Sequence, residues 1–128
     1  MERIDIDGPD VDYDESQLLL YRGEYFTGEA VEYFPDGRLW TLKTFADGFE
    51  DGPTRQWFRD GTLQSEGVAK RNCAVGEWKT WFPGGRLERV STFDDDGNLL
   101  TRIEWDEDGQ IVKQSPPPAP DYGPGAEK

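Results

Sequence analysis

The sequence contains no histidine, and it holds only one cysteine and one methionine. Histidine is the commonest general base, triad member and metal ligand, so its absence argues against an enzyme or a metal centre. The lone Cys73 excludes an intramolecular disulfide, and no apolar run has the pattern of a signal peptide or a membrane span. We therefore expect a non-catalytic protein of a reducing, cytoplasmic compartment, without catalytic residues, cofactor or metal.

Helix signals are also missing. No stretch keeps an apolar period of about 3.6 residues for long enough to form a stable helix. Hydrophobic residues make up only 34% of the chain, yet aromatic residues reach 13%, so the apolar material lies in a few large rings. Because large rings suit strands and shallow cores, the composition predicts an all-β protein.

Basic residues are scarce at both ends of the chain. The 27 acidic residues outnumber the 14 lysines and arginines, which gives a net charge of -13. Residues 1–20 carry seven acidic residues and one basic residue, residues 94–128 carry nine and three, and residues 21–93 are nearly neutral. This distribution repels nucleic acid and anionic membranes and attracts a basic protein partner.

What the sequence does contain is an internal repeat of 24 residues. Glycines mark it at Gly37, Gly61, Gly85 and Gly109, and at Gly28, Gly52 and Gly76. An aromatic residue precedes each glycine of the first row, and an aliphatic residue follows it: Tyr33, Trp57, Trp81 and Trp105; Leu39, Leu63, Leu87 and Ile111. Because glycine adopts a positive φ without strain, Asp-Gly at this place is typical of a hairpin turn. Each repeat is therefore expected to be one β-hairpin.

The predicted fold is all-β, an elongated antiparallel meander of about four 24-residue β-hairpin repeats. We place an acidic N-terminal segment at residues 1–17 and the repeat domain at residues 18–114, with Leu18–Tyr21 as an opening cap strand. Residues 115–128, which contain Pro-Pro-Pro-Ala-Pro, are expected to form a disordered tail.

Two stretches of the repeat resemble a known family. Residues 28–39 have the sequence Gly-Glu-Ala-Val-Glu-Tyr-Phe-Pro-Asp-Gly-Arg-Leu, and residues 76–87 have Gly-Glu-Trp-Lys-Thr-Trp-Phe-Pro-Gly-Gly-Arg-Leu. Over about residues 21–114 the chain is similar to the MORN-repeat variant, whose bacterial members include YwqK-type antitoxins; Gly84 and Asp106 depart from its pattern. The resemblance implies a hairpin array that binds a protein partner, in the antitoxin branch an immunity protein that silences a toxin. It implies no catalytic residue.

The aromatic rows suggest a binding face. In a hairpin with a two- or four-residue loop, Trp40 lies opposite Tyr33. This register predicts two faces: Tyr33, Trp57, Trp81 and Trp105 on one; Phe34, Phe58, Phe82, Leu39, Leu63 and Leu87, joined by Phe45, Trp78 and Phe93, on the other. We expect the Phe/Leu face to be buried. The tryptophan face also carries Arg55 and Lys79, and Trp, Tyr and Arg are typical hot-spot residues. Its rings and Trp40 are therefore candidate partner-binding residues, the alternative being that the rings pack within the molecule.

Three further features were weighed for chemistry. The acidic run Asp94, Asp95 and Asp96 is a candidate for partner binding; for a calcium loop, its glycine is at the fourth rather than the sixth position and Trp105 occupies the twelfth. Paired carboxylates for glycosidase chemistry are disfavoured because the acidic clusters lie in expected turns. Cys73 shares its repeat phase with aromatic residues, which predicts a packed thiol rather than a nucleophile.

These observations lead to two functional hypotheses. The first is a non-catalytic immunity or antitoxin-like protein that neutralises a basic, nuclease-like toxin, with no nucleic-acid or membrane partner. The second is a generic MORN-type scaffold or self-assembling interaction module without a toxin partner. A monomer or weak homo-oligomer is expected in either case.

Overall fold

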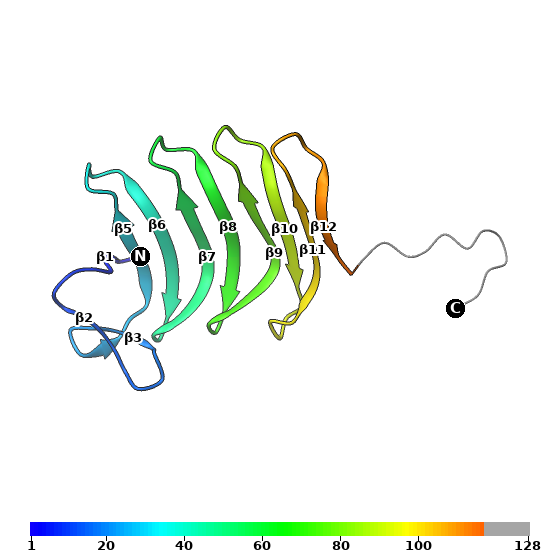
Figure 1. Cartoon of the computed structure of the whole chain (residues 1–128). Helices are drawn as coiled ribbons and strands as arrows, with labels where there is room; N and C mark the ends of the chain where they lie inside the picture. Colours follow the sequence, from blue (N-terminus) through cyan, green and yellow to red (C-terminus); the bar gives the residue numbers. More distant parts are fainter. Residues whose placement is uncertain (117–128) are drawn as a thin grey trace.

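The computed structural model describes residues 1–116, and these contain twelve strands and no helix (Figure 1). The strands are β1 (Arg3–Asp5), β2 (Val11–Tyr13), β3 (Leu19–Tyr21), β4 (Glu24–Tyr25), β5 (Gly28–Tyr33), β6 (Leu39–Ala46), β7 (Phe49–Trp57), β8 (Leu63–Lys70), β9 (Cys73–Trp81), β10 (Leu87–Phe93), β11 (Leu99–Trp105) and β12 (Ile111–Ser115). A search of the described residues for a helix capable of spanning a membrane finds none.

Strands β5 to β12 form an antiparallel meander in sequence order, and β1 adds to it as a parallel edge strand beside β5. Strands β2, β3 and β4 form a second, three-stranded sheet at the N-terminal end (Figure 1). The prediction of an all-β meander of hairpin repeats is confirmed. The parallel β1 was not foreseen, and β3 pairs within the small sheet rather than opening the meander.

Each hairpin turn of the repeat has a three-residue loop. In the first turn the backbone N–H of Phe34 donates to the carbonyl of Arg38 at 2.8 Å, and the N–H of Gly37 donates to the carbonyl of Phe34 at 2.8 Å. Gly37 has a φ of 90°, which completes a type I turn followed by a left-handed residue. The same bond pair starts at Phe58, Phe82, Asp94 and Asp106. The expected two- or four-residue loop is therefore wrong.

The three-residue loop changes which side chains share a face. Tyr33 pairs with Leu39, because a register shift displaces Trp40 from the position opposite Tyr33. The same pairing recurs as Trp57 with Leu63, Trp81 with Leu87 and Trp105 with Ile111. Directly paired residues project from the same face of a sheet. The prediction that the leucines and the tryptophans project from different faces of the sheet is therefore wrong. The leucines belong to the tryptophan face.

At the opposite edge of the sheet, two of the three turns are tighter. Asp47 and Gly48 connect β6 to β7 with φ angles of 50° and 87°, and Arg71 and Asn72 connect β8 to β9 with 49° and 71°. Two consecutive positive φ angles define the type I′ turn that matches the twist of a two-residue hairpin. The third connection at this edge, between β10 and β11, is the longer acidic loop that begins at Asp94.

The hydrophobic core lies at the N-terminal end and not along the sheet. Its cluster of buried side chains joins the small sheet and its flank to the first strands of the meander: Ile4, Leu19, Phe26, Ala30 and Phe45. The small sheet is fixed to the β6–β7 turn by two backbone bonds at Gly48, which accepts from the N–H of Leu19 and donates to the carbonyl of Phe26, each at 2.9 Å. We call residues 1–26 the N-terminal cap.

The expected Phe/Leu core face is thus wrong in two respects. Phe45 is buried, but under the N-terminal cap, whereas Leu39, Leu63 and Leu87 are only partly buried on the tryptophan face. The residues set apart as an acidic N-terminal segment hold β1 and β2, and Ser115 ends β12. Residues 117–128, most of the expected tail, lie outside the described residues.

Candidate functional site

A continuous row of ring and aliphatic side chains crosses one face of the sheet. Each of the rings ends its strand, on β5, β7, β9 and β11, and each pairs with an aliphatic residue that begins the next strand. We call this row the ring stripe and its face the ring face: Tyr33, Leu39, Trp57, Leu63, Trp81, Leu87, Trp105 and Ile111. Tyr33 is 45% exposed and Ile111 55% exposed, while the tryptophans are partly buried. The structure therefore brings four predicted site residues onto one face.

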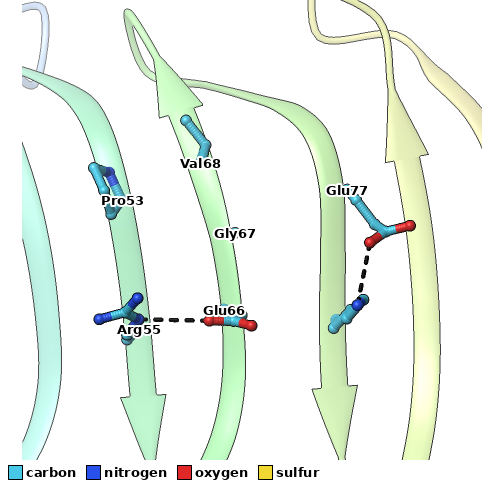
Figure 2. Close-up of a pocket in the computed structure, with 7 residues that line it drawn as sticks. Pro53, Arg55, Glu66, Gly67, Val68 and Glu77 are labelled. Atoms are coloured by element: carbon cyan, nitrogen blue, oxygen red, sulfur yellow. Dashed lines mark ion pairs between the residues drawn. The ribbon is translucent and has the colours of Figure 1, made fainter.

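A ladder of charged and apolar side chains runs beside the ring stripe. Its members pair strand by strand across the ring face: Val31, Leu42, Arg55, Glu66, Lys79, Val90, Ile103 and Gln114. Arg55 Nε lies 3.5 Å from Glu66 Oε1, and Lys79 Nζ lies 3.2 Å from Glu77 Oε1 (Figure 2). These pairs are well exposed and contribute little to stability. Their charges therefore remain available to a partner.

A shallow hollow opens between the two ion pairs. Pro53 and Val68 line it together with the four charged side chains, and it has a volume of about 230 Å³. Figure 2 shows the two ion pairs on neighbouring strands, with Pro53 and Val68 beyond Arg55 and Glu66. The hollow offers positive, negative and apolar groups side by side. A partner side chain of either charge can find a complement there.

Most side chains of the ring face are exposed or partly exposed in the described part of the chain, and Val31 on β5, at 1% exposed, is buried. From β6 to β12, the strands pair within this one sheet, and the ring-stripe side chains on them are exposed or partly exposed. In a protein with two layers, rings at this density would meet a facing helix or sheet. Here the ring stripe is available for contact with another molecule.

Trp40 packs against Phe34, a ring outside the ring stripe. The rings of Trp40 and Phe34 stack with their centroids 5.4 Å apart. The guanidinium of Arg59, in the turn between β7 and β8, lies 5.5 Å from the centroid of the Phe34 ring. Arg38 Nη1 donates to the carbonyl of Arg59 at 2.9 Å, so the first two turns are linked. Trp40 is 37% exposed. It therefore packs at the turn edge of the first hairpin.

The acidic run Asp94, Asp95 and Asp96 lies in the turn between β10 and β11. The rings of the ring stripe lie beside the turns at the other edge of the sheet. The carboxylate of Asp94 accepts from the backbone N–H of Asn98 at 2.9 Å and of Asp96 at 2.9 Å, and from Asn98 Nδ2 at 3.1 Å. It therefore builds its own loop. Asp95 and Asp96 are exposed. The structure does not bring the acidic run and the ring stripe into one site, and the described residues contain no cluster of three potential metal ligands.

The turn carboxylates give a pH-dependent prediction. Hydrogen bonds from the backbone N–H and then the side chain of Asn98 lower the pKa of Asp94 from its ordinary 3.8, and the backbone N–H of Leu18 followed by the hydroxyl of Tyr25 does the same for the pKa of Asp14. A lowered folded pKa stabilises the fold above the unfolded pKa, and this stability is lost as the pH falls through the folded value. We expect the free energy of unfolding to fall below about pH 4.

Denaturant unfolding at a series of pH values measures this dependence. The Asp94→Asn variant should show a flatter loss of stability in acid than the parent protein. Asp95→Asn is the matched control, because its carboxylate makes none of the loop hydrogen bonds given above. Equal acid slopes for Asp94→Asn and the parent protein would contradict the assignment.

The expectation of a packed thiol at Cys73 is wrong. Cys73 is exposed, at the start of β9 directly after the turn formed by Arg71 and Asn72. Its repeat phase matches that of Phe49. The Phe49 ring is covered by the guanidinium of Arg71, 4.1 Å from the ring centroid, whereas Cys73 is exposed. Repeat phase alone therefore did not predict burial at this edge.

The aliphatic half of the ring stripe was missed by sequence reasoning. Its signal was present in the turn, because a glycine in the third loop position favours a three-residue loop. That loop moves Leu39 to the place opposite Tyr33. Applied to every repeat, the same shift would have placed the leucines on the ring face.

Comparisons with known proteins give no family for this chain. No protein-family model matches it, and no curated protein matches it. A solved structure, the crystal structure of a GtfA/B complex bound to UDP and GlcNAc, is similar over 84% of this chain with 9% sequence identity and a TM-score of 0.35. This chain covers 24% of that protein's length. A likeness of this level carries no argument about fold or function.

Proposed function

We propose that this protein is a non-catalytic protein-binding module of the immunity or antitoxin type, which neutralises a cognate basic, nuclease-like toxin through its ring face. The observation that carries the proposal is the ring stripe, a row of aromatic and aliphatic side chains that are all exposed or partly exposed within residues 1–116. The resemblance of the repeat to the antitoxin branch of the MORN-repeat variant supports the same direction.

The composition of the ring face suits a protein interface. Tyrosine, tryptophan and arginine supply most hot spots, which cluster where neighbouring contacts exclude water. On this face the rings of Trp57 and Trp81 lie two residues from Arg55 and Lys79 on the same strands. A partner that covers the stripe would bury the rings and desolvate the ion pairs at once. Binding would then depend on both ring contact and charge complementarity.

Net charge adds long-range attraction. The charge of -13 draws a basic partner toward the protein, and the acidic residues at both ends of the chain increase the rate of encounter. Because the acidic run at Asp94 lies at the far edge of the sheet, its contribution is to steering rather than to the buried contact. The association rate should therefore fall steeply as salt is raised.

Co-expression with the product of the adjacent gene tests the proposal. We expect that product to be toxic alone and harmless together with this protein, and the two to co-purify. In the purified pair, Tyr33→Ala should weaken binding by about tenfold or more, because an exposed ring of the stripe is lost. Tyr13→Ala is the matched control: Tyr13 is 46% exposed against 45% for Tyr33, but it lies on β2 in the small sheet.

Two results would overturn the proposal. One is a neighbouring product that is harmless alone or does not bind. The other is a complex in which Tyr33→Ala and Tyr13→Ala behave alike, since the ring stripe would then play no special part.

A second function, self-assembly, is favoured by a specific feature of the C-terminal edge. Ile111 and Val112 on the last strand are 55% and 63% exposed, and Leu99 and Leu100, at the other end of the neighbouring β11, are 45% and 52% exposed. An exposed edge strand with apolar side chains is a template for pairing with another chain. Sedimentation analysis distinguishes the two functions: a concentration-dependent oligomer that Val112→Lys abolishes would support a self-assembling scaffold, and a persistent monomer would exclude it.

A further inference from the structure

A hollow of about 140 Å³ lies over β9, β10 and β11 on the face opposite the ring stripe, which we call the back face. Two arginines, two aromatic rings and two hydroxyl side chains line it: Arg89, Arg102, Trp78, Phe93, Thr80 and Ser91. The strand register places them together, because Ser91 pairs with both Trp78 and Arg102, and Arg89 pairs with Thr80. The lining contains two positive charges and no acidic residue.

Among the described residues, neither guanidinium group has a hydrogen bond to a carboxylate, and only that of Arg102 is anchored by a hydrogen bond to a side chain. Arg102 Nε donates to Ser91 Oγ at 3.0 Å, and Ser91 is 4% exposed, so this contact anchors the Arg102 side chain at the floor of the hollow. Arg89 Nε is buried and has no hydrogen-bond partner among the described residues. The nearest carboxylate oxygen of its ion pair, Glu104 Oε2, is 3.9 Å away, beyond hydrogen-bond distance. The chain has a net charge of -13, and this hollow nevertheless has two arginines and no acidic residue in its lining.

The chemistry of the hollow selects a class of ligand. Guanidinium groups bind carboxylates through planar, paired N–H donors, and the hydroxyls of Thr80 and Ser91 can donate further hydrogen bonds. The rings of Trp78 and Phe93 favour a flat apolar body beside that carboxylate. Glu104 and the overall negative charge disfavour a dianion.

We propose that the back-face hollow binds an aryl monocarboxylate. The carboxylate lies between the guanidinium groups of Arg89 and Arg102, and the aromatic body contacts Trp78 and Phe93. This site is independent of the proposed toxin interface, because it lies on the other face of the sheet and uses different residues. The proposed ligand is a small molecule that binds non-covalently.

Benzoate is a direct probe for this site. Titration of the ¹⁵N-labelled full chain with benzoate should shift the indole N–H signal of Trp78 and leave those of Trp57 and Trp81 unchanged, with a Kd on the order of 1 mM for a ligand of this size. Benzyl alcohol, which has the ring without the charge, should shift the signal much less, and inorganic phosphate, which has charge without the ring, should bind more weakly than benzoate.

Variants identify the residues responsible. Arg102→Met should weaken benzoate binding by about tenfold or more, because a charge-assisted hydrogen bond is lost. Arg102→Lys keeps the charge without the planar donor pair and should fall between Arg102→Met and the parent protein. Arg55→Met, which removes a cation from the ring face, is the control and should bind as the parent protein does.

The proposal is overturned if benzoate leaves the Trp78 signal unmoved, if benzyl alcohol shifts it equally, or if phosphate binds more tightly than benzoate. Equal binding by Arg102→Met and Arg55→Met overturns it as well. The benzyl alcohol and phosphate comparisons use the parent protein, so they decide the question even if an arginine variant does not fold.

Discussion

Replacing Leu19 by alanine is expected to lower the free energy of unfolding by about 2–5 kcal/mol, the range for a leucine truncated inside a packed core. Leu19 is fully buried, and its backbone accepts from the N–H of Phe26 at 3.1 Å while donating to the carbonyl of Gly48 at 2.9 Å. It therefore lies where the N-terminal cap meets the β6–β7 turn of the meander. The sheet has no other buried cluster of this kind among the described residues.

Chemical denaturation measures this effect, and Leu99→Ala provides the matched control. Leu99 is 45% exposed on β11, so its truncation removes little buried surface and should change stability by no more than about 0.5 kcal/mol. If Leu19→Ala were as mild as Leu99→Ala, the cap would contribute little to stability. The repeats would then have to hold together through strand pairing alone.

The second large effect is expected at Gly67 on β8. A Cβ atom added there would lie 2.1 Å from Trp78 Cδ2, so the indole ring could not stay in place. The ring is also fixed by a hydrogen bond of 3.0 Å from Trp78 Nε1 to the carbonyl of Val68. Gly67→Ala should therefore lower the free energy of unfolding by about 1–3 kcal/mol through overpacking, with about 1 kcal/mol more if the hydrogen bond breaks.

A double-mutant cycle separates this clash from an intrinsic effect of the glycine. With the ring removed in Trp78→Ala, the added methyl group meets no indole, and alanine costs less conformational entropy in a strand than glycine. Gly67→Ala should then be neutral or stabilising in the Trp78→Ala background, measured by the same denaturation assay. An equal loss in both backgrounds would mean that the clash is not the cause.

The repeat architecture was predictable because it is periodic. The 24-residue spacing of Gly37, Gly61, Gly85 and Gly109 corresponds in the structure to one turn per hairpin, each glycine with a positive φ. Local chemistry decides such turns, and local chemistry is what a sequence pattern contains. The hairpin order and the absence of helix in residues 1–116 follow from it.

The side chains beside the turns were harder to predict because they depend on one residue of loop length. The predicted register holds along most of the first hairpin, from Gly28 opposite Phe45 to Glu32 opposite Thr41, and a bulge shifts only the pair next to the turn. That single residue separated Leu39 from Tyr33 in the prediction and placed Trp40 in its stead. The prediction that the four rings share one face was correct, because each ring lies at the same distance before its turn.

The N-terminal cap could not be predicted from the repeat at all. Ile4, Leu19 and Phe26 lie outside the glycine period, and their contacts with Ala30 and Phe45 join segments far apart in the sequence. Such contacts depend on how the cap folds back over the first hairpin. No spacing in the sequence marks them, and the acidic composition of the first residues pointed instead to a separate segment.

The central claim is that the ring stripe is the binding surface, and tryptophan indole signals test it most directly. In the complex with the co-expressed partner, the ¹⁵N indole signals of Trp57, Trp81 and Trp105 should shift or broaden. The signal of Trp78, on the back face, should stay where it is in the free protein. A complex that perturbs Trp78 and leaves the three stripe tryptophans unchanged would contradict the account.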